Sequence, residues 1–128
     1  IDLVQVDWEI VFARIINKTL YKIPEIGYNI QMNYEEKIIQ WHHDRNLIDG
    51  STDKDQFMKL VQEMGELSDN ICKGKDIRDD CGDIMVVLIN IMERNNVSLT
   101  ECLSVAYDDI KDRKGRMVDG VFVKEGDK

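Results

Sequence analysis

The hydrophobic positions of residues 54–73 recur with the spacing of one face of an α-helix. The stripe consists of Phe57, Leu60, Val61, Met64, Leu67 and Ile71. This i, i+3, i+4 pattern predicts an amphipathic helix with one half-buried side. The next predicted helix, over residues 77–95, differs because it is apolar nearly all round between Ile84 and Ile89. Such a helix is buried on several sides, which indicates a subunit interface as well as a core.

Two further helices and a hairpin are predicted around this pair. A helix over residues 34–45 and another over 99–114 each follow a sequence that can cap a helix. The expected capping residues are Asn33 with Glu36, one of Ser51, Thr52 and Asp53, Asp76, and Ser98 with Glu101. The apolar stripe of the 99–114 helix is Leu103, Ala106, Tyr107 and Ile110. Asp119-Gly120 is a hairpin-turn signal, so residues 117–124 are expected to form a short β-hairpin or an extended tail. The predicted fold class is therefore an all-α helical bundle with a small C-terminal appendage.

Residues 1–31 carry two overlapping patterns. Their apolar positions alternate as in a strand and also fit a helix stripe, and we favour a helix over about residues 3–19. Pro24 and Gly27 then break the chain. We expect residues 1–31 to be an N-terminal extension and residues 32–128 to form the helical domain.

Two acidic pairs flank a predicted break at Lys73-Gly74-Lys75. Glu63 and Glu66 are three residues apart, and so are Asp80 and Asp83, so each pair lies on one helix face. An antiparallel helix hairpin that turns near Lys73 would set Glu63 beside Asp83 and Glu66 beside Asp80. We expect no Arg or Lys on these faces, so a divalent cation with oxygen ligands, Mg²⁺ above all, would neutralise the carboxylates. A solvated acidic face on two amphipathic helices is the other interpretation.

Composition limits the classes of partner. The chain has 128 residues, 43% of them hydrophobic and 33% charged, which is ordinary for one globular domain. A net charge of −8 argues against a protein that binds nucleic-acid backbones. Three cysteines without CxxC spacing (Cys72, Cys81 and Cys102) are typical of reduced, mostly core thiols in a cytoplasmic protein. No apolar run reaches the roughly 18 residues of a membrane span, and no signal peptide is apparent.

Neither histidine is expected to bind a metal. His42 and His43 are adjacent, so on a helix their side chains point about 100° apart. Neither follows a Glu at the Glu-x-x-His spacing of di-iron carboxylate bundles, since Ile39 and Gln40 stand at those positions.

One basic cluster, residues 111–116, interrupts the acidic chain. Cations are favourable at the C-terminal end of a helix, which is a sufficient structural reason for the cluster. Contact with phosphate groups beside a metal site is the functional interpretation.

The segment LVQEMGEL, residues 60–67, followed by DCGD, residues 80–83, resembles the MazG-like all-α nucleoside triphosphate pyrophosphohydrolases. The family pattern is EExxE and, after a gap, ExxD. Glu63, Glu66 and Asp83 match this pattern, whereas Gln62 and Asp80 stand where the family has Glu. Asp53-x-x-Gln56 and the segment from Ala106 to Gly115 also resemble family features, so the resemblance covers residues 34–124.

The resemblance implies a helical bundle that assembles as a dimer or a dimer of dimers. It also implies Mg²⁺-dependent hydrolysis between the α and β phosphates of a nucleoside triphosphate, with Glu63, Glu66, Asp80 and Asp83 as metal ligands. Glu63 is the candidate for orienting or deprotonating the attacking water. The candidates for substrate binding are Lys111, Arg113 and Lys114 for phosphate, Trp41 for base stacking, and Gln56. The alternatives are a more selective enzyme acting on dUTP, dCTP or phosphoribosyl-ATP, and a helical interaction protein that has lost turnover.

Overall fold

The computed structural model describes residues 9, 11–12, 15 and 33–126. The helix predicted over residues 3–19 lies mostly outside these residues, and the described positions 9, 11, 12 and 15 are helical. The whole of residues 16–32 also lies outside them.

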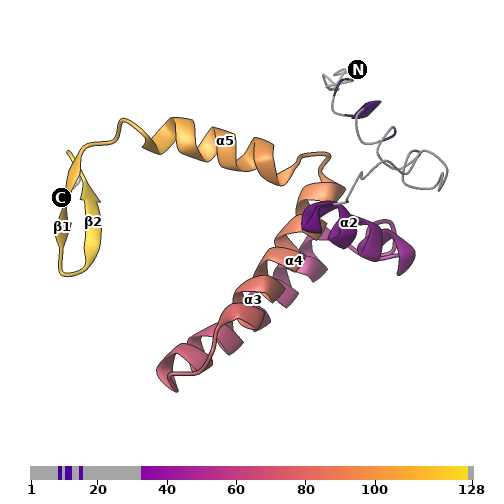
Figure 1. Cartoon of the computed structure of the whole chain (residues 1–128), viewed down its shortest axis with the longest axis horizontal. Coiled ribbons are helices and arrows are strands. Elements are labelled where there is room, and N and C mark those ends of the chain that lie inside the picture. Colours follow the sequence, from indigo (N-terminus) through magenta and orange to yellow (C-terminus); the bar gives the residue numbers. More distant parts are fainter. Residues whose placement is uncertain (1–8, 10, 13–14, 16–32, 127–128) are drawn as a thin grey trace. The chain divides into compact units, whose positions relative to one another are not determined.

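Within residues 33–126 the chain is mostly helical and ends in a two-stranded antiparallel sheet (Figure 1). The helices are α2 (Tyr34–Asp44), α3 (Asp53–Cys72), α4 (Arg78–Arg94) and α5 (Leu99–Ile110). The strands β1 (Gly115–Val118) and β2 (Val121–Lys124) pair in the register Gly115 to Lys124 and Val118 to Val121. The predicted helical class and the predicted hairpin are confirmed, although α5 ends before residue 114 and β1 begins before residue 117. None of the helices in the described part combines the length and apolar character that a membrane crossing requires.

Short-range capping determines where the helices begin. The hydroxyl of Thr52 accepts a hydrogen bond from the backbone N–H of Asp55, which selects Thr52 among the three expected caps of α3. Ser98 and Glu101 form the predicted capping box of α5. Asp76 is not the N-cap of α4, because that position belongs to Ile77. Its carboxylate still accepts the N–H of the first helical residue, together with the guanidinium of the same arginine.

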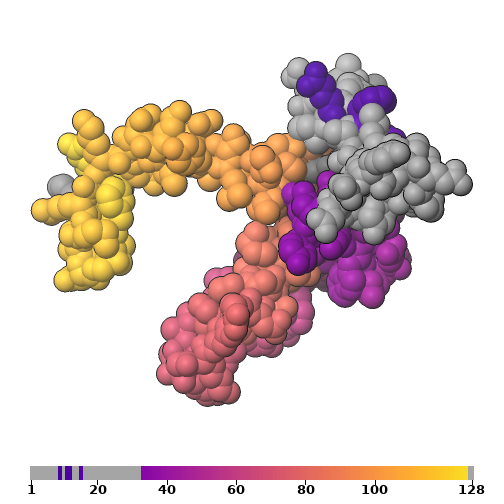
Figure 2. Space-filling model, in the orientation of Figure 1, coloured from indigo at the N-terminus to yellow at the C-terminus, as the bar shows by residue number. Residues whose placement is uncertain are grey.

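Helices α3 and α4 pack against each other as an antiparallel hairpin. Lys73 ends α3, and Gly74 follows with φ of +66°, a left-handed conformation that glycine adopts without a steric penalty. In the space-filling view the two helices form one continuous body (Figure 2). The predicted break and the predicted hairpin are therefore confirmed.

The face of α3 that packs on α4 is not the apolar stripe predicted for this helix. Phe57, Met64 and Ile71 are each more than half exposed, at 56%, 54% and 58%. The buried residue of α3 is instead Glu63, and the leucines on either side of it, Leu60 and Leu67, are half-buried. The acidic face and the apolar stripe both repeat with the helical period, so the pattern fits either face. The prediction that the apolar stripe is the buried face is therefore wrong for most of its residues. Periodicity alone does not determine which of two neighbouring faces meets the partner helix.

A buried polar network joins α2 to the second half of α4. His42, 2% exposed, has Nε2 at 2.9 Å from the carbonyl oxygen of Val86, and its Nδ1 lies 3.2 Å from the amide nitrogen of Asn90. Asn90 is fully buried and also donates to the carbonyl of Leu47. Nε2 of His42 therefore carries the proton and Nδ1 accepts. Both ring nitrogens of His42 therefore have hydrogen-bond partners within the fold.

The thiols differ from prediction. Cys72 and Cys81 are exposed and Cys102 is half-buried, and all three are free. The expectation of mostly core cysteines is wrong, because the first two lie at the turn end of the α3–α4 hairpin, where each helix has one open side.

Candidate metal centre

Four polar side chains on one face of α3 meet the start of α4. They are Lys59, Glu63, Glu66 and Asn70, at i, i+4, i+7 and i+11. This spacing returns to the same side of an α-helix. The sequence-based prediction included the two glutamates and missed the lysine and the asparagine, which share their helix face.

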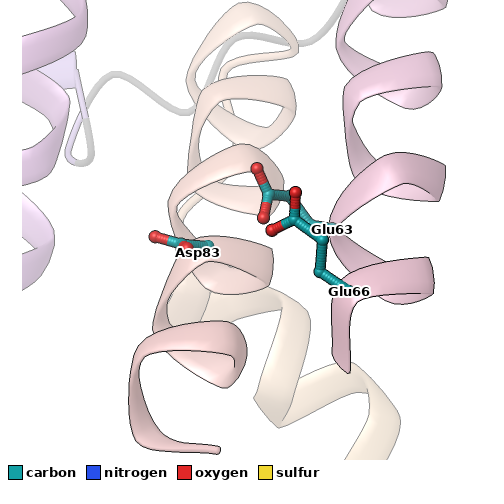
Figure 3. Close-up of side chains that lie close together, drawn as sticks. All are labelled: Glu63, Glu66 and Asp83. Carbon is teal, nitrogen blue, oxygen red and sulfur yellow. The ribbon is translucent and has the colours of Figure 1, made fainter. Parts of the chain in front are cut away.

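Three carboxylates come together at this face. The ligand atoms of Glu63, Glu66 and Asp83 all lie within 4.8 Å of one another. Glu63 and Glu66 extend from α3 towards α4, which carries Asp83 (Figure 3). Glu63 is buried, Asp83 is half-buried and Glu66 is exposed, so the cluster runs from the helix interface to solvent. The predicted neighbourhood of Glu63 and Asp83 is present in this arrangement.

Repulsion and burial raise the pKa of two of these carboxyls. The pKa of Glu66 is raised above its ordinary 4.5, chiefly by the charge of Glu63. The pKa of Asp83 is raised above 3.8, first by burial and then by the charges of Asp79, Glu63 and Asp80. Oε2 of Glu63 is buried and has no hydrogen-bond partner among the described residues. A proton shared with Glu66, or a cation, would satisfy this atom.

The cluster has a counter-charge that the sequence-based prediction excluded. Nζ of Lys59 lies 3.1 Å from Oε1 of Glu63, in an i, i+4 pair. Lys59 is about half exposed, whereas the Glu63 side chain is 9% exposed. The expectation that these faces supply no Lys or Arg is therefore wrong. Lys59 offsets the charge of Glu63, but that charge still contributes to the raised pKa of Glu66 and of Asp83.

Asp80 lies beside the cluster in a different environment. It is 6% exposed, and both of its carboxylate oxygens accept from Nδ2 of Asn70, at 3.0 and 2.9 Å. Its charge is among the smaller causes of the raised pKa of Glu66 and of Asp83. The structure thus gathers three of the four predicted ligands within 4.8 Å of one another, and the fourth, Asp80, is held by the amide of Asn70 outside that group.

The predicted substrate-binding residues have local partners. Gln56 donates to the hydroxyl of Ser51 at 2.9 Å. The exposed ring of Trp41 is covered on one face by the guanidinium of Arg45, 4.4 Å from the ring centre. No hydrogen bond or ion pair within the described ranges joins Gln56 or Trp41 to the acidic cluster.

The basic cluster is likewise paired within its own segment. Lys111 lies 3.4 Å from Asp108, and Arg113 lies 2.6 Å from Asp109. The backbone carbonyl of Lys114 accepts from the N–H of Glu125, which attaches the start of β1 to the end of β2. In the part of the chain that the structure describes, none of these cations bonds to the acidic cluster.

The donor set fits a hard divalent cation. Mg²⁺ takes oxygen ligands and usually keeps several waters, so that one or two carboxylates plus substrate phosphates suffice. Glu63, Glu66 and Asp83 could supply such oxygens, and the unpartnered Oε2 of Glu63 is the atom that would gain most.

Comparison with known proteins gives one distant relative. No protein-family model and no solved structure matches the chain. The uncharacterized 18.2 kDa protein in the rep-hol intergenic region of Haemophilus phage HP1 (strain HP1c1) is 41% identical over 64 residues. The match covers 48% of this chain and 39% of the phage protein, so the chain spans about two-fifths of that relative's length.

Proposed function

We propose that this protein is a Mg²⁺-dependent nucleoside triphosphate pyrophosphohydrolase that releases a monophosphate and pyrophosphate. One observation carries the proposal. Three carboxylates from two helices converge within 4.8 Å, and a buried oxygen of one of them has no hydrogen-bond partner among the residues that the structure describes. The resemblance of this same stretch to the MazG-like family adds the substrate class and the bond that is broken.

Glu63 is the proposed catalytic residue. Its Oε1 is occupied by Lys59, which leaves Oε2 to accept a proton from the attacking water. The water oxygen forms a bond to the α phosphorus. The bond between that phosphorus and the bridging oxygen breaks, and pyrophosphate leaves with the bridging oxygen. Glu66 and Asp83 would hold the cation together with Glu63. When bound, Mg²⁺ supplies the positive charge that screens the triphosphate and polarises the water.

Substrate recognition is assigned to residues outside the acidic cluster. Lys111, Arg113 and Lys114 are the proposed phosphate contacts, which requires Lys111 and Arg113 to exchange their aspartate partners for phosphate oxygens. Trp41, whose ring is exposed and carries the Arg45 guanidinium on one face, is the proposed stacking platform for the base. Gln56 is the proposed polar contact.

We also propose a homodimer or a dimer of dimers. The apolar residues of α3 that do not meet α4 are exposed, and so is the apolar stripe of α5, where Leu103 is 59% and Tyr107 63% exposed. Within α5 no residue is buried. A second copy that covers these faces would complete a core that is small in one chain, since exposed apolar patches of this kind mark interfaces. The expected mass by light scattering is two or four times 14.9 kDa, and a monomer at all concentrations would refute this part.

Lys59 supports the alternative of an inactive or weakened relative. A lysine that already neutralises Glu63 lowers the attraction of the site for a cation. In that case the protein would be a helical interaction protein with the same bundle. A more selective enzyme for dUTP, dCTP or phosphoribosyl-ATP remains the other alternative. The phage relative makes a role in nucleotide supply during phage growth a reasonable context, and the proposed location is the cytoplasm.

The test is a turnover assay with separate readouts for pyrophosphate and orthophosphate. The protein is incubated with Mg²⁺ and a panel of canonical and modified nucleoside triphosphates. We expect pyrophosphate release that is lost in Glu63→Gln and Asp83→Asn. Asp69→Asn is the matched control, because Asp69 is an exposed carboxylate of α3 that pairs with Lys73 at the turn. No turnover with any substrate, or equal turnover in all three variants, would refute the proposal.

A further inference from the structure

The turn end of the α3–α4 hairpin contains one amide–carboxylate pair. Asn70 donates from Nδ2 to both oxygens of Asp80, at 3.0 and 2.9 Å. Asn70 is half-buried and Asp80 is 6% exposed, so this pair is shielded from water, unlike the surface pairs of the same hairpin. A buried carboxylate requires hydrogen bonds, and in the described residues this amide supplies them.

An amide at this position does something that a basic residue would not. A lysine or arginine would hold Asp80 and also neutralise it, as Lys59 does for Glu63. The amide of Asn70 orients the carboxylate through a dipole and leaves its full negative charge in place. An ionised carboxylate offers about four lone-pair sites, and the two bonds from Asn70 use one on each oxygen. The remaining lone pairs stay open for a cation.

Asp80 is close enough to the cluster for this to matter. Asp80 lies in the first turn of α4, three residues before Asp83, so the two share a helix face, and its partner Asn70 lies one turn after Glu66 on α3. Aspartate has a short side chain with few rotamers, so the direction of its oxygens depends on what holds them. In the structure that direction is determined by Asn70.

We propose that Asn70 is a positioning residue that fixes Asp80 as the fourth oxygen donor of the cation site while preserving its charge. This inference rests on the cation site of the proposed function and not on the reaction. It assigns a role to a residue outside the acidic motif, at i+4 from Glu66 and i+7 from Glu63. Hydrogen-bonded partners of this kind typically change metal affinity by 10–100-fold when they are removed.

A purely structural role is the competing explanation. The pair could act only as a polar connection between two helices, as Asp53 and Arg94 do at the other end of the hairpin. Removing Asn70 would then lower stability and leave cation affinity per folded molecule unchanged. A positioning role predicts that the effect on affinity depends on Asp80, which a double-mutant cycle measures directly.

The experiment titrates the full chain with Mn²⁺, a hard cation that takes oxygen ligands, and follows binding by electron paramagnetic resonance. Asn70→Leu removes the donor with little change in volume. Gln40→Leu is the matched control, because Gln40 also donates its amide to an aspartate, Asp44, on α2. We expect Asn70→Leu to weaken Mn²⁺ binding about 10–100-fold and Gln40→Leu to leave it unchanged. Circular dichroism verifies folding, and Asn70→Ala serves the same comparison if the leucine variant does not fold.

The cycle is completed with Asp80→Asn and the double variant. We expect the double variant to bind Mn²⁺ no more weakly than Asp80→Asn alone, and Asn70→Gln, which keeps the amide, to recover part of the affinity. An unchanged Mn²⁺ affinity in Asn70→Leu would overturn the role of Asn70. So would a loss of affinity from Asn70→Leu that is as large in the Asp80→Asn variant as in the unmodified protein. Absence of Mn²⁺ binding by the unmodified protein would overturn both this role and the cation site. Binding with the expected cycle but without nucleotide turnover would refute the proposed reaction and support the positioning role.

Discussion

Replacing Asp83 by asparagine is expected to change stability in opposite directions with and without Mg²⁺. In the metal-free protein Asp83 repels Glu63, whose ligand atom lies within 4.8 Å. Two unit charges at that distance repel by about 1 kcal/mol in water and about 3.5 kcal/mol at an effective dielectric constant of 20. Because Asp83 is only half-buried and solvent screens its charge, the lower value is used. Asp83→Asn should therefore raise the free energy of unfolding by about 1 kcal/mol in EDTA.

Mg²⁺ should reverse this order. A ligand present at 100 times its Kd adds about 2.7 kcal/mol to the stability of the form that binds it. The unmodified protein gains this amount, whereas the variant has lost one of the three clustered carboxylates and gains little. With Mg²⁺ the unmodified protein should then be the more stable by about 1–2 kcal/mol.

The assay is urea denaturation followed by circular dichroism, in EDTA and in saturating Mg²⁺. Asp69→Asn removes an exposed charge from the same hairpin and should change stability by less than about 1 kcal/mol in both conditions. Destabilisation by Asp83→Asn in EDTA would show that the cluster is not repulsive. Identical curves for the unmodified protein with and without Mg²⁺ would refute a cation at this site.

The remaining predictions concern pH, the buried network and the hairpin. The pKa of Glu66 and of Asp83 is raised in the folded state, so the folded, metal-free protein binds protons that the unfolded chain does not. The contribution of these two groups to the free energy of unfolding therefore increases as pH falls from neutral towards 4.5 and 3.8. The same protons compete with Mg²⁺, so its stabilising effect in urea denaturation should shrink over that range, and an effect that grows at low pH would contradict this. Burial lowers the pKa of His42 below 6.5, so its contribution to stability should be lost as pH falls through that lowered pKa, and NMR titration of its ring at or above 6.5 would refute the burial argument. Asn90→Leu should cost about 2 kcal/mol in urea denaturation, because it leaves buried acceptors without a donor, and a neutral effect would mean that the network adds nothing. Gly115→Ala should disrupt the β1–β2 pairing, since a Cβ there would collide with a backbone oxygen and an aromatic ring of the facing strand, and unchanged cross-strand NMR contacts would exclude the collision.

The residues of the candidate site could be predicted only in part. Glu63, Glu66 and Asp83 were identified because i, i+3 spacing and a hairpin turn near Lys73 are local properties. The companions of the acidic residues were not, although Lys59 and Asn70 lie on the same helix face. Lysine and asparagine are frequent on exposed helix faces, so their spacing becomes informative only when the partner oxygens of Glu63 and Asp80 are seen.

The core was predicted less well for a related reason. The apolar stripe through Phe57 and Met64 and the polar face through Glu63 have the same period, and burial energy alone favours the first. Within one chain, however, α4 packs against the polar face that contains Glu63. The apolar stripe is left exposed, which is why a second copy of the chain was proposed to cover it.

The amino-acid sequence by itself determined the helix start at Ser98 and the break at Gly74, limited the start of α3 to Ser51, Thr52 or Asp53, and indicated the turn at Asp119-Gly120. Each of these depends on contacts within a few residues, where side-chain caps and left-handed glycine conformations decide the outcome. Only the tertiary structure decided how α3 is rotated about its axis against α4. That rotation buries Glu63 and brings Asn70 to Asp80, and it depends on contacts between residues far apart in the chain, which no local pattern specifies.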